Sequence, residues 1–285
     1  MTDILPLAHA RSLLFAPGNR PERFSKAARS GADALILDLE DSVPLFEKAA
    51  ARDVVTQHWP MLQAFEKPLV VRINAITSDT GRSDLEWIEH LPNVAGVMIP
   101  KAQSADLLAG LHTRLGKTPI LPLVESAAGW HALPSLAAVP GVLRLALGNI
   151  DFMADTGLSS DEQESELAPL RFAVAMATRL GDLFPPIDGV TAQIDDAQRL
   201  SNDTRRAIRF GFSGKLCIHP RQVEVVHEAL APTLQELSWA RKVIAADEAS
   251  GGNAVQVDGR MVDLPVVTEA RRTVARAGFS RKEVK

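Results

Sequence analysis

Several residue types and segments are scarce or absent in this sequence, and their absence narrows the possibilities. The 285 residues include no tyrosine and a single cysteine, Cys217. Mechanisms with a tyrosyl acid are therefore excluded, as are an intramolecular disulfide and a thiolate zinc cluster. No apolar run approaches the roughly 20 residues that a membrane span needs, and residues 1–11 do not have the pattern of a signal peptide. We expect a cytoplasmic protein without a membrane partner.

The chain also lacks an excess of charge of either sign. Its formal net charge is −4, and its charged residues, 23% of the total, are mixed in sign. Nucleic-acid-binding proteins usually carry a basic patch, so we expect no nucleic-acid partner. With 46% hydrophobic residues, the composition is that of a globular protein, and the length suits two small domains or one large α/β barrel.

Short apolar runs alternate with segments of helical spacing along most of the chain. The eight strand-like runs are 12–17, 34–39, 69–73, 94–99, 120–124, 144–147, 186–191 and 215–218. Most are continuously apolar, which is typical of parallel strands buried on both faces. The intervening segments 21–30, 104–115 and 167–180 each precede a glycine, a common helix stop.

This alternation predicts a (β/α)₈ TIM barrel over residues 1–225. A doubly wound open sheet is the alternative, but it would usually have a glycine-rich phosphate turn after its first strand. Here the first strand ends in Pro17-Gly18-Asn19-Arg20-Pro21, which does not match that turn. The barrel is therefore favoured.

Residues 226–285 are more than a barrel needs. A helical stretch at 232–249 leads into Gly251-Gly252, which is typical of a hinge or turn. A strand-like piece at 254–262 and a helix from Pro265 follow. We expect a C-terminal lid or oligomerisation segment, and a closed homo-oligomer, a trimer or a multiple of one, in which this segment is buried against a neighbour. The alternative is that the segment packs on its own barrel.

Charged residues stand where several predicted strands end, which is where barrel enzymes place catalytic groups. Glu125 and Asp151 follow the fifth and sixth strands, and two such carboxylates suit a hard dication such as Mg²⁺. An N-cap is the alternative role for Asp151. Glu40 and Asp41 are adjacent and tend to point in different directions, so that one would support the metal and the other would bind backbone amides. Of the two, Glu40 is expected to belong to the catalytic residues.

Arg72 closes the third apolar run. Its planar guanidinium suits a substrate carboxylate or an enolate oxygen, and a salt bridge with one of the acids is an alternative that can coexist with this role. Cys217, within an apolar strand, is expected to be a core residue. His219 is followed by Pro220 and is expected to shape the eighth loop or to touch ligand through its backbone.

At these residues the sequence resembles the citrate lyase β-subunit family within the HpcH/HpaI aldolase group, along nearly the whole chain. The densest stretches of resemblance are Arg11–Phe24, Gly31–Val43, Val71–Asn74, Leu123–Ser126, Ala146–Phe152 and Gly214–Pro220. Many relatives have a Pro-Arg-Gly or similar run after the metal glutamate, whereas this chain has Ser126-Ala-Ala-Gly129. The departure leaves the metal ligand in place and concerns the identity of the substrate.

The resemblance implies a set of roles for named residues. Mg²⁺ would be held by Glu125 and Asp151, and Arg72 would bind the substrate. A CoA thioester would enter along the first and eighth loops; the residues expected to line its path are Phe15, Lys26, Ile218 and His219. Asp263 would cross into the active site of a neighbouring copy and move the proton.

The expected activity is Mg²⁺-dependent cleavage of a carbon–carbon bond in a short 3-hydroxyacyl-CoA of the citryl-, citramalyl- or malyl-CoA type. The products would be an acyl-CoA and a 2-oxo acid, formed through a stabilised enolate. Two alternatives remain open: a CoA-independent pyruvate aldolase, and a subunit of a larger lyase complex that acts on an acyl group carried by another protein.

Overall fold

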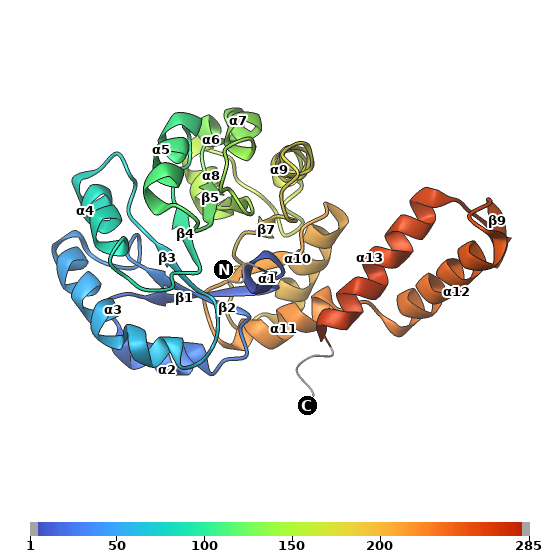
Figure 1. Ribbon diagram of the computed structural model, residues 1–285, viewed down its shortest axis with the longest axis horizontal. Helices are drawn as coiled ribbons and strands as arrows, with labels where there is room; N and C mark the ends of the chain where they lie inside the picture. Colours follow the sequence, from blue (N-terminus) through green and yellow to red (C-terminus); the bar gives the residue numbers. More distant parts are fainter. Residues whose placement is uncertain (1–4, 281–285) are drawn as a thin grey trace. The chain divides into compact units, whose positions relative to one another are not determined.

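The computed structural model of the protein describes residues 5–280. The chain forms two compact units that divide between Val226 and His227. The first contains a closed barrel of eight parallel strands, in which β1 pairs with both β2 and β8 (Figure 1). The strands are β1 Ser12–Pro17, β2 Ala34–Asp38, β3 Leu69–Arg72, β4 Gly96–Ile99, β5 Ile120–Val124, β6 Ala146–Leu147, β7 Ile187–Asp188 and β8 Gly214–Cys217. The predicted TIM barrel is confirmed.

Helices follow the strands and surround the barrel (Figure 1). Those of the first unit are α1 Leu5–Ala8, α2 Pro21–Ala28, α3 Lys48–Gln63, α4 Asp79–Ile88, α5 Ala105–Leu115, α6 Ala127–His131, α7 Leu133–Ala137, α8 Asn149–Thr156, α9 Ala168–Leu180, α10 Ala197–Arg209 and α11 Arg221–Leu230, with 3₁₀ turns η1 Leu45–Glu47 and η2 Ser165–Leu167. α11 runs past the division into the second unit.

The interior of the barrel explains which side chains reach its mouth. Alternate residues of a strand point to the same face. Inward-facing members of the core are Leu13, Ile36, Val70, Leu123 and Leu216. Two residues further along the same five strands stand Phe15, Asp38, Arg72, Glu125 and Ile218. The side chains at the mouth therefore continue the inward-facing rows of the core.

Arg144 ties together the opposite, N-terminal end of the barrel. It is fully buried and donates to the carbonyl oxygens of Leu7, Ala10 and Pro185 at 3.2, 2.8 and 2.7 Å and to Ser213 Oγ at 3.1 Å. Because the burial is complete, the pKa of Arg144 falls to about 9. This guanidinium links α1 to the loops that precede β6, β7 and β8.

A second buried charge cluster lies outside the barrel wall, between β7, β8 and α9. Asp188 accepts hydrogen bonds from Lys215 Nζ at 2.8 Å and from Arg171 Nε at 3.0 Å. Arg171 also pairs with Glu164 at 2.5 Å. All four residues are buried, and their opposite charges balance, so this cluster fastens helix to strand.

The C-terminal unit has a small core of its own. It contains α12 Leu234–Ser250, the hairpin β9 Val255–Val257 and β10 Arg260–Val262, and α13 Leu264–Ser280. The predicted single strand-like piece is thus a hairpin. Its two-residue loop, Asp258-Gly259, is left-handed at both positions, as a type I′ turn requires.

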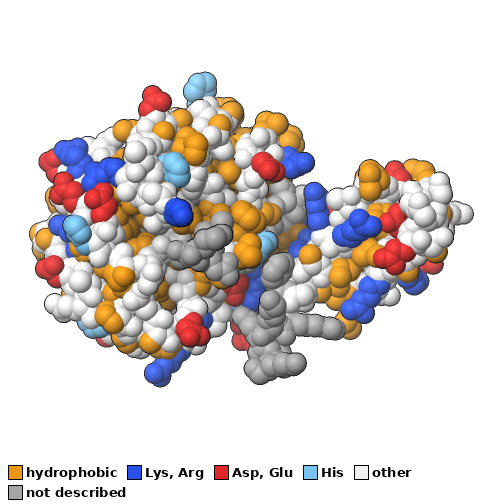
Figure 2. Space-filling model, viewed as in Figure 1, with side chains coloured by type: hydrophobic (Ala, Val, Ile, Leu, Met, Phe, Trp, Pro, Cys, Tyr) orange, Lys and Arg blue, Asp and Glu red, His pale blue; other side chains and the backbone are white. Residues whose placement is uncertain are grey.

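The core of this unit is formed by α12, β10 and α13; its buried members are Ala240, Val243, Val262, Val267 and Ala270. On the face drawn in Figure 2, hydrophobic side chains lie among charged groups of both signs over α12 and α13. Within residues 5–280, no helix is long and apolar enough to cross a membrane.

Candidate active site

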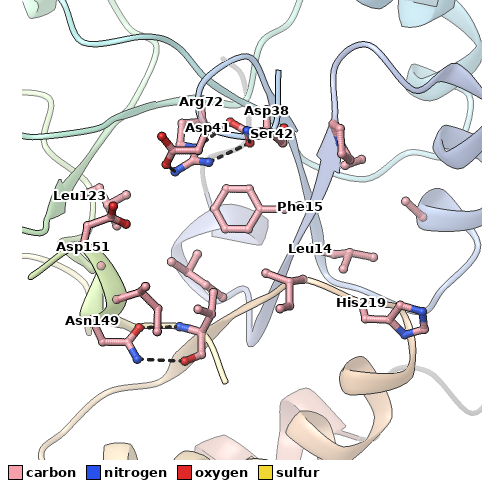
Figure 3. Close-up of a pocket in the computed structure, with 18 of the residues that line it drawn as sticks. Leu14, Phe15, Asp38, Asp41, Ser42, Arg72, Leu123, Asn149, Asp151 and His219 are labelled. Carbon is pink, nitrogen blue, oxygen red and sulfur yellow. Dashed lines mark hydrogen bonds and ion pairs between the residues drawn. The ribbon is translucent and has the colours of Figure 1, made fainter. Parts of the chain in front are cut away.

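A cavity of about 700 Å³ opens at the C-terminal ends of the barrel strands. Seven of the nine predicted site residues line it: Phe15, Lys26, Arg72, Glu125, Asp151, Ile218 and His219. In Figure 3, Asp151 and His219 stand on opposite sides of the cavity and Phe15 lies between them. Glu40 does not line the cavity but contacts Arg72, and Asp263 belongs to the C-terminal unit.

Arg72, the last residue of β3, is held in place by the carboxylate that ends β2. Its Nε and Nη2 donate to the two oxygens of Asp38 at 2.7 and 2.8 Å. Burial alone would raise the pKa of Asp38, but the Arg72 guanidinium outweighs it and holds that pKa below its usual range. Both groups are therefore ionised, and the guanidinium has a fixed orientation.

The remaining nitrogen of Arg72 faces two further carboxylates and the cavity. Nη1 lies 2.9 Å from Glu40 Oε2 and 3.4 Å from Asp41 Oδ2. The guanidinium carbon also lies 4.8 Å from the centre of the Phe15 ring (Figure 3), a cation–π contact. The predicted salt bridge of Arg72 with an acid is present, and its strongest partner is Asp38.

Glu125 has one oxygen satisfied and one left without a partner. Oε1 accepts the backbone N–H of Lys101 at 2.7 Å, while Oε2 is buried and has no hydrogen-bond partner. Burial, together with the nearby negative charges of Glu40 and Asp151, raises the pKa of Glu125 to about 8. A buried, unpartnered carboxylate oxygen beside other acids is suited to a cation.

Gly148 provides the space in which Glu125 lies. A Cβ atom built at Gly148 would come within 2.6 Å of both Cβ and Oε2 of Glu125, closer than any real side chain allows. Gly148 is also the N-cap of α8. Asp151 therefore occupies the first turn of that helix and is not its N-cap, so this alternative role is wrong.

Asp151 is half-buried and lines the cavity from α8. Asn149, two residues earlier, fixes the start of α8 through hydrogen bonds with both N–H and C=O of Val190, each at 3.0 Å (Figure 3). Among the described residues, no three His, Cys, Asp or Glu side chains are grouped to hold a metal. Two carboxylates fit Mg²⁺, which keeps water or substrate oxygens as its other ligands.

The outer part of the cavity has a different character. Lys26, in the last turn of α2, is exposed, and Ile218 is 39% exposed. The backbone N–H groups of Ile218 and His219 both donate to Gln222 Oε1, at 2.8 and 3.2 Å. Partial burial, with Arg221 and Lys26 nearby, lowers the pKa of His219. This shift favours the neutral form of the imidazole.

Glu40, predicted to be a catalytic residue, is buried and contacts two basic residues. Besides Arg72, it accepts a hydrogen bond from Lys101 Nζ at 3.0 Å. The loop that holds it is supported from beneath by Lys48, whose Nζ donates to the carbonyl oxygens of Leu39 and Glu40 at 2.7 and 2.6 Å. Its neighbour Asp41 is exposed, and it is Asp38 that accepts backbone N–H groups, from Glu40 and Ser42.

Three residues of this site received no role from the sequence: Asp38, Lys101 and Gly148. For Asp38, the signal was its inward-facing position at the end of a buried strand. For Lys101, the signal was a charge directly after the fourth strand. No sequence signal pointed to Gly148. A side chain is excluded there only because Glu125 occupies the space, and the sequence does not show that contact.

Asp263, predicted to move the proton, is a residue of the C-terminal unit. Asp263 stands between β10 and α13, where its Oδ1 accepts the backbone N–H of Val266 at 3.4 Å. It is half-buried within its own unit. Cys217 is fully buried in β8, and burial raises the pKa of its thiol to about 12, so it is a core residue without nucleophilic character.

Comparison with known proteins adds to this geometry. The family model described as HpcH/HpaI aldolase/citrate lyase matches residues 11–220, and one described as a carbon–carbon bond lyase of the TIM-barrel fold matches residues 170–279. A citrate lyase subunit beta-like protein from Deinococcus radiodurans is 36% identical, over 93% of this chain and 96% of its own length.

Two further relatives extend the comparison. Citrate lyase subunit beta of Escherichia coli K12 is 32% identical, over 95% of this chain and 94% of its own length. The crystal structure of protein CitE from Mycobacterium tuberculosis in complex with magnesium, acetoacetate and coenzyme A is 34% identical. It matches 95% of this chain and 99% of that chain with a TM-score of 0.83.

Proposed function

Because the chain belongs to the HpcH/HpaI aldolase/citrate lyase family of carbon–carbon lyases, we propose that it cleaves a short 3-hydroxyacyl-CoA ester. The substrate would be of the citryl-, citramalyl- or malyl-CoA type, and the products an acyl-CoA and a 2-oxo acid. The observation that carries this proposal is the buried, unpartnered Oε2 of Glu125 in the same cavity as Asp151 and the Asp38-anchored Arg72. In this arrangement the two acids would bind a dication, and Arg72 would bind a carboxylate of the substrate next to it.

Glu125 and Asp151 are the residues that would hold Mg²⁺. When bound, the ion would supply Lewis-acid polarisation of the substrate's oxygens. The homologous CitE of M. tuberculosis binds magnesium together with acetoacetate and coenzyme A, which supports a site for an ion, a short oxo acid and CoA in this chain as well.

Arg72 would bind the negative charge of the substrate and of the enolate that carbon–carbon cleavage leaves. Its Nη1 is the nitrogen that Asp38 does not occupy. Because Asp38 fixes the guanidinium in advance, little reorganisation is needed when charge develops, and one such donor is typically worth about 3–4 kcal/mol in the transition state. Glu40 and Asp41 also lie beside this nitrogen, at 2.9 and 3.4 Å.

The acyl-CoA would extend from this inner site toward the outer part of the cavity. Phe15 and Ile218 offer apolar surface, and Lys26 offers an exposed ammonium for the phosphates. The lowered pKa of His219 favours the neutral imidazole, so this side chain would contribute a hydrogen bond and not a charge.

Proton transfer to the enolate carbon requires an acid, and we assign this role to Asp263 of a neighbouring copy in a homo-oligomer. General acid–base help of this kind typically contributes about 10²–10⁴-fold in rate. The assignment rests on the family resemblance, and its test is the subunit-mixing experiment in the Discussion.

The proposed activity is tested with a panel of CoA thioesters. Purified chain and Mg²⁺ are incubated with citryl-CoA, citramalyl-CoA and malyl-CoA, and release of the 2-oxo acid is followed. We expect one ester to be cleaved with a kcat/KM at least tenfold above the others, and no release after chelation of the metal. Absence of cleavage of every ester would contradict the proposal.

Two controls in the same assay separate the alternatives. Cleavage of a free 4-hydroxy-2-oxo acid to pyruvate and an aldehyde, without CoA, would indicate a pyruvate aldolase. The E. coli relative is named as a subunit of citrate lyase. The second control therefore offers the same acyl group attached to an acyl-carrier protein as the substrate. Cleavage of the carrier-bound ester alone would indicate a subunit of a larger complex.

A further inference from the structure

Lys101 has an unusual backbone for its residue type. It follows β4 and Pro100 and has a φ of +50°, in the left-handed region that L-residues other than glycine, asparagine and aspartate rarely adopt. Such a conformation costs conformational energy and persists only where surrounding contacts hold it. The contacts of Lys101 identify what holds it here.

The main chain of Lys101 contacts one metal candidate. Its N–H donates to Glu125 Oε1 at 2.7 Å, which leaves the other oxygen, Oε2, without a partner. That free oxygen lies toward Gly148, since a Cβ there would be 2.6 Å away. Gly148 begins the helix that carries Asp151. The amide of Lys101 thereby determines which oxygen of Glu125 remains for an ion.

The side chain of Lys101 contacts the other half of the site. Nζ donates to Glu40 Oε1 at 3.0 Å, and Glu40 Oε2 lies 2.9 Å from Arg72 Nη1. Glu40 is therefore a bridge between two cations, and without the ammonium its carboxylate would have a single charged partner. Lys101 is half-exposed at its side chain (50%), so small solutes can reach the position of the ammonium.

We propose that Lys101 is a positioning residue that sets the two halves of the active site in register: its backbone N–H presents Glu125 to the metal, and its ammonium holds Glu40 against Arg72. This inference rests on the proposed function, because it takes Glu125 as a metal ligand and Arg72 as the substrate-binding group. The two contacts of Lys101 come from different parts of the residue, so substitutions can separate them.

The main-chain contact is tested by comparing Lys101→Val with Lys101→Met. Both lack the ammonium, but a β-branched residue resists a positive φ more strongly than an unbranched one. Binding of Mg²⁺ alone is measured by titration calorimetry. We expect Lys101→Met to bind Mg²⁺ within about threefold of the parent chain and Lys101→Val at least tenfold more weakly. Equal affinities in folded Val and Met variants would overturn this half of the proposal.

A milder pair covers the case in which Lys101→Val does not fold. In Lys101→Gly the backbone can adopt the left-handed conformation without strain, whereas in Lys101→Ala the Cβ atom keeps that conformation strained. We then expect Lys101→Ala to bind Mg²⁺ more weakly than Lys101→Gly. The reverse order, or no difference, contradicts the main-chain role. A parent chain that binds no Mg²⁺ would instead contradict the proposed function itself.

The side-chain contact is tested with Lys101→Ala and added amines. We expect kcat to fall at least tenfold, with part of the loss restored by millimolar methylammonium, which can occupy the exposed position beside Glu40. The control is Lys117→Ala, because Lys117 is an exposed lysine in the loop before β5 and does not line the cavity. Its kcat should equal that of the parent chain, with or without methylammonium. Full kcat in Lys101→Ala, or a loss that amines do not restore, would overturn the side-chain role.

Discussion

Asp38, the last residue of β2, and Arg72, the last residue of β3, form a two-point ion pair at the mouth of the barrel. Nε and Nη2 of Arg72 donate to separate oxygens of Asp38, at 2.7 and 2.8 Å. Since β2 and β3 are adjacent and Asp38 pairs with Arg72 in register, the two side chains leave neighbouring strands at the same level. The register of two adjacent parallel strands thus fixes the orientation of the arginine that we propose to bind substrate.

This pairing makes Arg72→Lys a severe change. A lysine ammonium keeps the charge but cannot make two parallel bonds to Asp38 and still present a donor to the cavity. We expect kcat/KM to fall at least about 100-fold, in line with the loss of one preorganised donor. Steady-state kinetics measure this effect, with far-ultraviolet circular dichroism to verify folding. Near-normal kcat/KM would show that Arg72 is a structural partner of Asp38 only.

Glu125→Gln and Asp151→Asn should weaken metal binding, because each replaces a carboxyl group that can ionise beside the ion with an amide that stays neutral. We expect a loss of Mg²⁺ affinity of at least tenfold in each, measured by calorimetry, and loss of Mg²⁺-dependent activity. Asp155→Asn is the matched control, because Asp155 is on the same helix as Asp151 but does not line the cavity. Unchanged Mg²⁺ affinity in either site variant removes that residue from the metal assignment.

Gly148→Ala tests the space that Glu125 needs. The added Cβ would lie 2.6 Å from Glu125 Oε2, so the glutamate must move. We expect Mg²⁺ affinity to drop at least tenfold and stability to fall by about 1–3 kcal/mol, the usual cost of overpacking. Gly110→Ala is the control, since a Cβ there meets nothing within 4 Å. A Gly148→Ala chain with normal affinity would show that Glu125 has an alternative productive position.

Acid should weaken the buried cluster around Asp188. Burial would raise the pKa of Asp188, but Lys215 and Arg171 hold it below its usual 3.8. A lowered pKa in the folded state contributes stability above the unfolded pKa and loses it as pH falls through the folded value. The stability conferred by Asp188 should therefore be complete at pH 7 and decline below about pH 4.

Denaturant unfolding of Asp188→Asn at several pH values measures this contribution. At pH 7 we expect a loss of about 3–5 kcal/mol, because Lys215 and Arg171 remain buried without their carboxylate. The difference from the parent chain should shrink as the pH falls below 4. Asp182→Asn, at a highly exposed carboxylate, should show no such pH-dependent difference. A difference that stays constant from pH 7 to pH 3 contradicts the ionised state of Asp188.

The role assigned to Asp263 is tested by mixing inactive subunits. Asp263→Ala and Arg72→Ala chains are each expected to be inactive, but a mixed oligomer would contain sites with both residues intact. We expect partial recovery of activity on co-assembly, with mixed oligomers verified by differential tags. No recovery in verified mixtures would mean that Asp263 does not serve the site of a neighbouring copy.

The sequence was sufficient to predict the barrel fold and the end of the barrel at which the site lies, because both follow from where the apolar runs begin and end. Continuous apolar runs predict buried parallel strands, and each of the eight predicted runs overlaps a strand in the structure. Five of the predicted runs, those that overlap β2, β3, β4, β6 and β7, are longer than the strands, and β6 and β7 have only two residues each. The charged residues that end the runs mark the mouth, where Arg72 and Glu125 lie.

Other features depend on contacts that no local pattern encodes. The left-handed backbone of Lys101 is held by Glu125, 24 residues away, and the roles of Asp38 and Gly148 likewise depend on partners in other strands. The hairpin in the C-terminal unit was detectable, because Asp258-Gly259 is a strong signal for a two-residue turn. The predicted single strand there missed that signal.

The buried Arg144 at the floor of the barrel has a consequence for how this protein can diversify. Its hydrogen bonds go to three main-chain carbonyls and one serine hydroxyl at the end opposite the cavity. Because every residue type has a main-chain carbonyl oxygen, most substitutions at the positions that accept from Arg144 leave these hydrogen bonds intact. Mutations that reshape the mouth for a new acyl group therefore act on a scaffold anchored elsewhere, and selection can alter substrate preference without dismantling the barrel.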